Sequence, residues 1–411
     1  MEIPKLASKH DCTGCMVCVD SCKHSALEGY KGYNGHWYVK LHKEKCVQCG
    51  LCVKKCPIVS SFSYQRKDDI GHPYAVWAND MKLRRESTSG GAFAALATYV
   101  ISIGGCVVGA TMEGNQIRHL LINDIKDISK LQGSKYIQGN LTGIYLKVKS
   151  ELEKKRIVLF SGTSCQVAAL YSFLPHAYEG LLFTLDLICG GFPSSLALDK
   201  FWSNEPIDIQ KITYRNKLTG WIGGNKLVVK TLDNQIIPYG KNVIYGAFYS
   251  GLTHRSSCHN CRFAIVNRKA DLTVGDFWGD KDYPEEHYWG ISVVVAHSKA
   301  GEKLLRLSNV TFHPSTWDKF LRRNFRMVCG KKRFLSLDIV YWVYPWLFHK
   351  CSYSTVKMVF GASEKVSLVW LIYKGCRRFI MWIPNKINQA TRERMVCEVL
   401  EKIKVKSNNN R

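Results

Sequence analysis

The 411-residue sequence lacks the patterns that would place it in several large classes of protein. No apolar run reaches the roughly 18 residues that a membrane-spanning helix needs, so a transmembrane protein is not expected. The first residues are polar and charged and hold no apolar signal-peptide core, which predicts a cytoplasmic protein. The patterns G-x-G-x-x-G and G-x-x-x-x-G-K-[ST] are also missing, which leaves a Rossmann-type NAD(P)H site and a P-loop without support.

Acidic residues are scarce relative to basic ones: 33 Asp and Glu stand against 58 Lys and Arg, for a net charge of +25. The excess is concentrated at the end of the chain, because residues 315–411 hold 20 Lys and Arg but only 6 Asp and Glu. If the positive charge binds nucleic acid or a membrane surface, the segment 315–411 is therefore the part expected to do so. No nucleic-acid-binding motif accompanies the charge, so we expect no nucleic-acid partner.

The segment 315–411 also contains many aromatic residues and two apolar runs, at 339–348 and 366–373. Short helices that carry Trp and Tyr beside Lys and Arg are typical of surfaces that lie on anionic lipid. One hypothesis is therefore peripheral contact of this segment with the inner membrane face. The alternative is a helical cap on the preceding domain.

Cysteine, in contrast, is abundant, with 17 residues, and in a reducing compartment such a chain more often holds metal than disulfides. Two runs near the N-terminus share the spacing C-x2-C-x2-C-x3-C. This spacing is typical of two 4Fe-4S clusters, in which each triplet binds one cluster and the fourth cysteine binds the other. Paired zinc sites fit poorly, since zinc usually takes its ligands as two separated pairs. The predicted ligand sets are Cys12, Cys15, Cys18 and Cys56 for one cluster, and Cys46, Cys49, Cys52 and Cys22 for the second.

Residues 8–60 as a whole resemble a two-cluster bacterial ferredoxin, an α+β fold, although Lys23 stands where proline is usual. The aromatic and β-branched run at 36–39 follows a glycine-rich turn and is expected to be a hairpin strand that packs over the clusters. A polar connector at 60–72 then separates this part from the rest of the chain.

After the connector, strand-like and helix-like segments alternate, which predicts an α/β body with a mostly parallel sheet. A strand at 74–78 leads to Ser89, Gly90 and Gly91 and then to a helix at 92–103. The backbone N–H groups at such a helix start suit a phosphate, although an ordinary serine cap explains the same residues.

Four further cysteines are candidates for a third cluster. Cys165 and Cys189 each follow a buried-type strand, at the position where open α/β sheets bind ligands. Cys258 and Cys261 form a C-x2-C pair, and the four thiols together match the requirement of one 4Fe-4S cluster. The alternative is that they are ordinary buried cysteines, which behave as small apolar side chains.

Six motifs occur in order along the body: RRESTSGGAF, GSKYIQ, LFSGTSCQVAAL, LDLICGGFPS, ITYRNKLTGW and CHNCRFAIVNRKADLTVGDFWG. With them, residues 74–310 resemble the coenzyme F420 hydrogenase/dehydrogenase beta-subunit family. The resemblance implies FAD, a 4Fe-4S cluster in the body and a redox partner such as ferredoxin. It also implies electron transfer between clusters and flavin, with a small organic molecule as substrate.

The resemblance assigns flavin contacts to Ser89, Gly90, Gly91, Ser134, Lys135 and Tyr136, where the lysine is expected to counter phosphate or flavin charge. Asp276 is a further candidate for flavin or substrate, with a turn cap as the alternative. Arg215 and Lys217 would either meet an acidic substrate or lie solvated. The sequence departs from the family at Ser164, where proline is usual, and at Gly190, where histidine commonly follows the cysteine. Loss of that imidazole removes a candidate for proton transfer, and no catalytic residue is assigned.

We therefore expect four parts: a ferredoxin domain at 1–66, a flavin-binding part at 72–150, a part at 151–314 for cluster, flavin and substrate, and the basic helical segment 315–411. The predicted function is an FAD- and 4Fe-4S-dependent oxidoreductase that reduces or oxidises an organic substrate or a coenzyme F420-like cofactor. The first alternative is a non-catalytic electron-transfer subunit for a partner redox enzyme, with a link to polysaccharide biosynthesis. The second is a relative that has lost its flavin.

Overall fold

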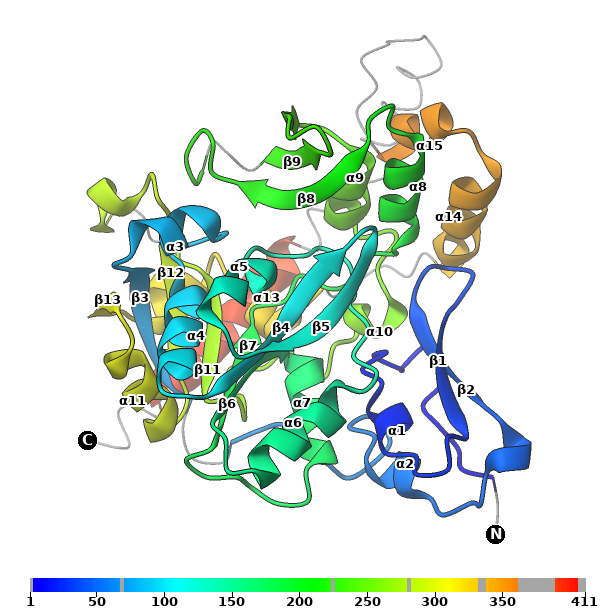
Figure 1. Cartoon of the computed structure of the whole chain (residues 1–411). Helices are drawn as coiled ribbons and strands as arrows, with labels where there is room; N and C mark the ends of the chain where they lie inside the picture. The colour runs from blue at the N-terminus through cyan, green and yellow to red at the C-terminus, as the bar shows by residue number, and fades with distance from the viewer. Residues whose placement is uncertain are drawn as a thin grey trace.

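The computed structural model describes residues 3–66, 70–222, 226–278, 282–331, 338–360 and 389–405 of the chain (Figure 1). Within these residues the strands form three sheets, of two, three and eight strands. The two-stranded sheet belongs to the N-terminal cysteine-rich part, and the eight-stranded sheet is the centre of the body.

The cysteine-rich part contains two short helices with the same local geometry. α1 Val17–Asp20 and α2 Leu51–Lys54 each begin two residues after the second cysteine of a triplet. The residues on either side of that cysteine have a left-handed backbone in both runs, and these are Gly14, Met16, Gln48 and Gly50. The repeated spacing in the sequence is therefore matched by a repeated backbone conformation.

A hairpin pairs β1 Leu27–Lys31 with β2 Trp37–Leu41 in antiparallel register. The aromatic run that we predicted as a strand lies largely in β2. In Figure 1 the hairpin stands beside the body, and its turn reaches α14 Asp338–Lys350. There the Tyr344 hydroxyl donates to the Asn34 carbonyl at 3.0 Å, so the C-terminal segment holds the hairpin turn.

The eight strands of the central sheet follow the order β13-β3-β12-β11-β7-β6-β4-β5. The central neighbours β11, β7, β6 and β4 are parallel, whereas the flanking strands pair antiparallel. The predicted parallel sheet is thus confirmed at the centre. β4 and β5 are joined by two residues, a connection that permits only antiparallel pairing. The bounds are β3 His72–Ala78, β4 Cys106–Glu113, β5 Gln116–Ile122, β6 Val158–Thr163, β7 Leu182–Leu187, β11 Leu272–Asp276, β12 Ser292–Ala296 and β13 Val310–Pro314.

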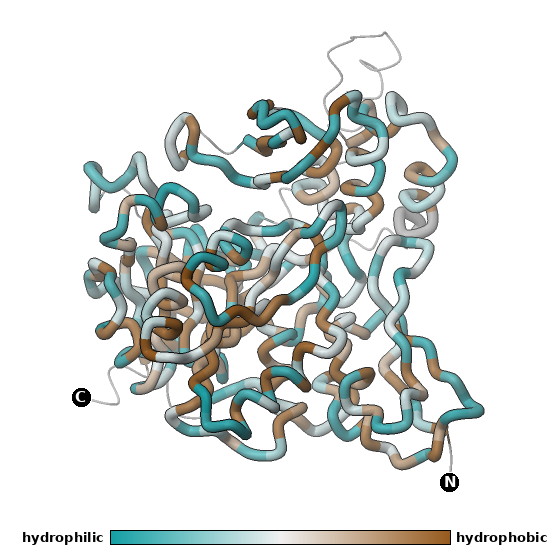
Figure 2. Tube along the Cα trace, viewed as in Figure 1, coloured by the Kyte–Doolittle hydropathy of each residue, from teal (hydrophilic) through white to brown (hydrophobic). Residues whose placement is uncertain are grey.

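Helices cover both faces of this sheet: α3 Met81–Glu86, α4 Ala92–Ser102, α5 Ile128–Leu131, α6 Ile144–Glu153, α7 Ser164–Phe173 and α11 Lys299–Leu307. Successive side chains of a strand point to opposite faces. Val107 and Leu159 therefore pack with α4 and α11, while Val108 and Phe160 pack with α6 and α7. Figure 2 shows the apolar residues gathered along these central strands.

A smaller lobe lies beside the sheet and combines β8 Ile209–Asn216, β9 Lys226–Thr231, β10 Ile236–Tyr239, α8 Leu196–Asn204 and α9 Val243–Ser250 (Figure 1). The antiparallel sheet β10-β9-β8 packs on α8 and α9 around buried aromatic residues such as Phe201 and Tyr214. α14 joins the same core through Tyr344 and Phe348, and α15 Tyr353–Phe360 joins it through Val356 and Phe360. The first apolar run of the C-terminal segment is therefore largely a packed helix.

The other described parts of the C-terminal segment pack against the side of the central sheet that holds β3 and β12. α12 Trp317–Leu321, α13 Arg326–Cys329 and a helix at 389–405 share a core with these strands. Across the described residues, no helix is both long and apolar enough to cross a membrane. The second apolar run, at 366–373, lies outside the described residues. The described C-terminal helices thus cap the body, and lipid contact stays a prediction.

Candidate functional site

A cavity of about 570 Å³ lies at the carboxyl ends of the parallel strands. Thr163 at the end of β6, Leu187 at the end of β7 and Asp276 at the end of β11 all line it. The start of α4 also lines it, through Gly91 and Ala92. This is the edge at which open α/β sheets bind their ligands.

Six of the seven predicted flavin residues line this cavity, although they come from three separate segments: Ser89, Gly91, Ser134, Lys135, Tyr136 and Asp276. The seventh, Gly90, lies between two of them, and a Cβ there would come within 2.6 Å of the Ser292 nitrogen, so only glycine fits. The first two segments are joined by a hydrogen bond of 2.8 Å from the Ser134 N–H to Thr88 Oγ1. The fold therefore brings the predicted residues together, and their contact with flavin stays a prediction.

The start of α4 at the cavity has no side-chain cap. Gly91 is the N-cap residue, with a left-handed φ of 85°, and Ser89 Oγ instead donates to the Ile291 carbonyl at 2.7 Å. Serine therefore does not cap this helix, although an ordinary serine cap was the alternative interpretation of the sequence. The first N–H groups of the helix lack a side-chain partner, and this arrangement suits a bound anion.

A buried ion pair forms part of the cavity wall. Arg215 Nη1 donates to Asp276 Oδ2 at 2.7 Å, and the two side chains are only 8% and 18% exposed. Burial by itself would lower the pKa of Arg215, but the charge of Asp276 and its hydrogen bond raise it above its usual value. Arg215 is therefore not a solvated side chain, and Asp276 is an ion-pair partner at the cavity.

Two lysines beside the cavity are engaged with backbone carbonyls. Lys135 Nζ donates to three carbonyls at the end of α5, at 2.8 to 3.3 Å, and burial lowers its pKa to about 7. Lys217 donates to three carbonyls, including that of Ser89, so it anchors the loop before α4 instead of lying in solvent. The ammonium of Lys135 is held by its own loop, and the charge-countering role expected of it stays a prediction.

His119 of β5 is a wall residue that sequence reasoning missed. It is buried, and burial lowers its pKa to about 3, so the ring is neutral at physiological pH. The sequence did offer one indication of this position. His119 falls on the buried side of a strand whose side chains alternate between exposed and buried.

Arg326 of α13 was also missed, because it belongs to the segment 315–411 that we interpreted only as a cap or lipid surface. A Cβ on Gly190 would lie 3.3 Å from Arg326 Cζ. The glycine at this departure from the family pattern therefore leaves room for an arginine from the C-terminal segment. No local sequence pattern connects these two residues.

The four body cysteines meet beside the cavity. Cys165 is in the first turn of α7, Cys189 follows β7, and Cys258 lies in α10 Ser256–His259, with Cys261 just after it. Burial raises the pKa of Cys165, and the charges of Cys261, Cys189 and Cys258 add to that rise. Cys165 and Cys261 also pack against one buried core cluster, and the binding of a 4Fe-4S cluster by the four thiols stays a prediction. Cys189 also lines the cavity itself.

Backbone donors reach these thiols. The Gly191 N–H donates to Cys189 Sγ at 3.3 Å, and the Phe192 N–H donates to Cys258 Sγ at 3.4 Å. Hydrogen bonds to sulfur are a feature of 4Fe-4S sites that sets their reduction potential. Nowhere in the described chain are three or more His, Cys, Asp or Glu side chains arranged to hold a single metal ion. The ligands of a 4Fe-4S cluster instead bind at the separated corners of a cube.

The four cysteines of the first predicted set lie around one cavity. This second cavity, of about 60 Å³, is lined by Cys12, Cys15, Cys18 and Cys56. In the second set, burial raises the pKa of Cys52, and the charges of Cys22 and Cys49 raise it further. Cluster binding by either set stays a prediction.

Comparison with known proteins gives two matches to family models. A 4Fe-4S dicluster domain matches residues 11–59. The second model describes the C-terminal region of the beta subunit of coenzyme F420 hydrogenase/dehydrogenase, and it matches residues 155–311. No curated protein sequence matches the chain.

Among solved structures, a chain from the xenon-derivatised F420-reducing [NiFe] hydrogenase complex of Methanosarcina barkeri is similar at 17% identity. The similarity covers 67% of this chain and 89% of that chain, with a TM-score of 0.43, which is too low to support an inference. The two family matches by themselves confirm the resemblance seen in the motifs. Residues 11–59 are therefore similar to 4Fe-4S dicluster domains, and residues 155–311 are similar to the C-terminal region of the coenzyme F420 hydrogenase/dehydrogenase beta-subunit family.

Proposed function

We propose that this protein is an iron-sulfur flavoprotein oxidoreductase in which a cluster on the four body cysteines exchanges electrons with FAD in the 570 Å³ cavity. The observation that carries the proposal is that one cavity is lined both by Cys189 and by six residues assigned to flavin. A flavin bound there would lie beside a ligand of the cluster. FAD supplies the exchange between one-electron and two-electron chemistry.

The cavity fits such a cofactor in size and lining. Its volume lies within the range of about 300 to 1,000 Å³ that is usual for cofactor sites. The uncapped start of α4 suits the pyrophosphate. Tyr136 and Phe248 stack at a centroid distance of 4.3 Å and offer an aromatic wall for the flavin ring.

The residues of the wall are suited to holding a ligand and excluding water. Burial raises the pKa of Tyr136, so its hydroxyl stays protonated and can donate a hydrogen bond. His119 is neutral and also buried. Arg215 carries a positive charge that Asp276 partly balances. These groups orient a ligand and set the charge around it, and we assign none of them a proton-transfer step.

The substrate we propose is an organic molecule or a coenzyme F420-like cofactor, following the family description. The second candidate is an electron-transfer subunit for a partner redox enzyme, which the words "beta subunit" in that description favour. Purification with a stably bound partner, together with no turnover by the isolated chain, would support this second candidate.

The decisive test is anaerobic purification followed by counting of iron, sulfide and flavin in one sample. About twelve irons and one FAD per chain are expected, since each of three clusters holds four irons. About eight irons with no flavin would contradict the proposal and leave a dicluster domain on an inert body.

A further inference from the structure

The two predicted N-terminal clusters differ in their position relative to the body. We call Cys12, Cys15, Cys18 and Cys56 the inner set, and Cys22, Cys46, Cys49 and Cys52 the outer set. Residues of the inner set belong to the same buried core cluster as α6 and α7 of the body. In the outer set, Cys49 is exposed.

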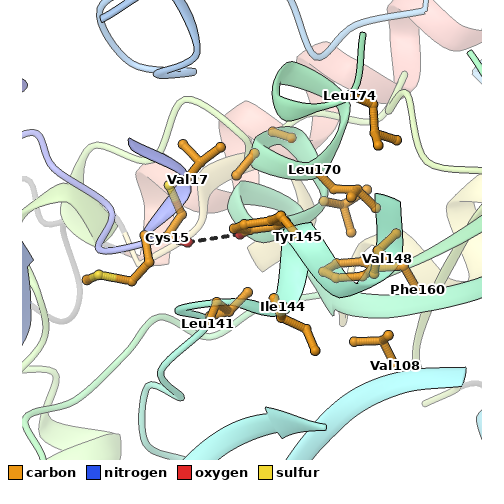
Figure 3. Packing of buried hydrophobic residues seen from close by; sticks show 14 of the residues in the cluster. Cys15, Val17, Val108, Leu141, Ile144, Tyr145, Val148, Phe160, Leu170 and Leu174 are labelled. Carbon is orange, nitrogen blue, oxygen red and sulfur yellow. Dashed lines mark hydrogen bonds between the residues drawn. The ribbon is translucent and has the colours of Figure 1, made fainter. Parts of the chain in front are cut away.

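Tyr145 of α6 links the inner set to the body cluster site. Its hydroxyl donates to the Cys15 carbonyl at 2.9 Å, and its ring is fully buried (Figure 3). Two body cysteines, Cys165 and Cys261, pack against the same buried core cluster that contains Tyr145 and Cys15. One core cluster therefore lies between the inner set and these body thiols.

The loop before Cys258 makes a second link. Arg255 is fully buried and donates from Nε to the Cys12 carbonyl at 2.5 Å, and from Nη1 to the Trp37 carbonyl at 2.7 Å. Ser257, the neighbour of Cys258 in the chain, also donates to the Cys12 carbonyl, at 3.1 Å. The inner set is thus held against the body cysteines from two directions.

Exposed basic side chains lie in the loops that carry the outer set. Val47, between two outer cysteines, is 52% exposed. Four lysines in the same loops are exposed, and they are Lys23, Lys43, Lys45 and Lys54. The two exposed acidic residues nearby, Glu28 and Glu44, are both paired with His42. The surface around the outer set therefore presents a positive charge.

We propose that the outer set is the docking surface for a small acidic iron-sulfur carrier protein of the ferredoxin class, and that electrons then pass from outer to inner to body cluster. In each encounter the carrier is oxidised by one electron and the outer cluster is reduced by one. Two encounters supply the pair of electrons for a two-electron product. Only the last step, into the body, rests on the proposed function.

The alternative is that the four lysines merely solvate the surface or balance the charge of the cluster. The two cases differ in kinetics. Complementary charge speeds the association of two proteins by about 10- to 1,000-fold at low ionic strength, and salt screens this effect. Lysines without a docking role would leave the association rate unchanged.

The test uses the anaerobic full-length holoprotein and reduced acidic ferredoxin in a stopped-flow experiment. We expect the double variant Lys45→Glu, Lys54→Glu to be reduced about tenfold more slowly at low salt. The difference should shrink at high salt, and reduction by dithionite, itself an anion, should be compared at high salt and should proceed equally there in both proteins. The matched control is Lys299→Glu, Lys303→Glu on α11, which changes the same charge far from the hairpin (Figure 1).

An equal rate for the Lys45, Lys54 variant and the α11 control would overturn the proposal. Slow reduction by dithionite as well would also overturn it, since it would mean that the substitutions damage the cluster. The experiment measures the rate at which the N-terminal clusters alone are reduced. A chain that proves to hold eight irons and no flavin would therefore still show the lysine effect, which separates this proposal from the proposed function.

Discussion

The N-terminal cysteine-rich part and the body cavity are built in opposite ways. All eight N-terminal cysteines lie between Cys12 and Cys56, and two short repeated loops arrange them. The cavity takes its wall from residues as distant as Ser87 and Arg326. A site of the first kind depends on local backbone geometry, whereas one of the second kind depends on the whole sheet. Substitutions should therefore have local effects in one part and wide effects in the other.

The largest expected effect comes from removing a body thiol. Cys189→Ala should lose about four irons per chain, since a 4Fe-4S cluster needs its four thiolates, and reduction of the flavin through the clusters should stop. The N-terminal clusters should stay. Iron counting and low-temperature electron paramagnetic resonance measure both outcomes. Cys106→Ala is the control, because Cys106 is a buried free cysteine that lies in β4 and belongs to none of the predicted ligand sets. Loss of iron in the control alone would contradict the assignment.

Next are the two buried ion pairs. Asp186 is completely buried and is bound by Arg268 at 3.2 Å, by the Tyr64 hydroxyl at 2.9 Å and by Thr273. Asp186→Asn should lower the free energy of unfolding by about 3 kcal/mol, because it leaves a buried arginine without its charge partner. Asp276→Asn should cost less, since its pair lies at a cavity. Chemical denaturation compares them, and only Asp276→Asn should weaken flavin binding. Equal loss of flavin from both variants would mean that Asp276 affects flavin binding only by stabilising the fold.

Two glycines sharpen the comparison further. Gly91 and Gly143 are both N-cap residues with left-handed φ angles of 85° and 82°. An alanine at either should cost about 1 to 2 kcal/mol of stability through backbone strain. Around Gly143 the space is open, whereas a Cβ on Gly91 would lie 3.1 Å from Ala78 Cβ and 3.2 Å from Arg84 Cα, at a helix start that lines the cavity. Flavin titration should therefore show weaker binding for Gly91→Ala and unchanged binding for Gly143→Ala. Weaker binding in both would point to general strain.

Acid should destabilise the protein through two neutral histidines. Burial lowers the pKa of His119 and of His297 to about 3, from an ordinary value of 6.5. Between these values the unfolded chain binds protons that the folded chain does not. Stability is therefore complete above pH 6.5 and falls as the pH drops toward 3, by up to about 1.4 kcal/mol per pH unit for each ring.

Denaturation at pH 6 and pH 4.5 would measure this slope. His297→Gln and His119→Gln should each reduce it by a similar amount, although one ring lies in the core and the other at the cavity. A slope identical to that of the natural protein in both variants would show that other groups cause the acid sensitivity.

The smallest expected effect concerns lipid. On α14, Val343 and Trp346 are exposed, while Tyr344 and Phe348 are buried. If the C-terminal segment contacts anionic membranes, Val343→Ser with Trp346→Ser should weaken co-sedimentation with anionic vesicles by a few-fold. These exposed positions test the hypothesis better than deletion of the segment, which would remove core residues. No sedimentation of the natural protein would end the hypothesis.

Several features of the site were predictable from the sequence. The spacing placed together four cysteines that line one cavity, and the motifs selected six residues that line the larger one. The antiparallel edges of the sheet were not predicted, because pairing direction depends on which distant strands become neighbours. Arg326 was also missed, since no pattern links α13 to the loop after β7. The sequence left the role of Lys217 open, because residues distant in the chain decide whether a lysine lies in solvent or binds backbone carbonyls.

The sequence by itself indicated the local structure of the two cysteine triplets, whose loops share a repeated backbone conformation. Such a loop depends on neighbours within a few residues, so its spacing is enough to predict it. Only the tertiary structure decided which cluster site meets the body, since Tyr145 and Arg255 reach it from segments more than 100 residues away. Burial, charge pairing and exposure are properties of the packed chain, and they separate the inner set from the outer one.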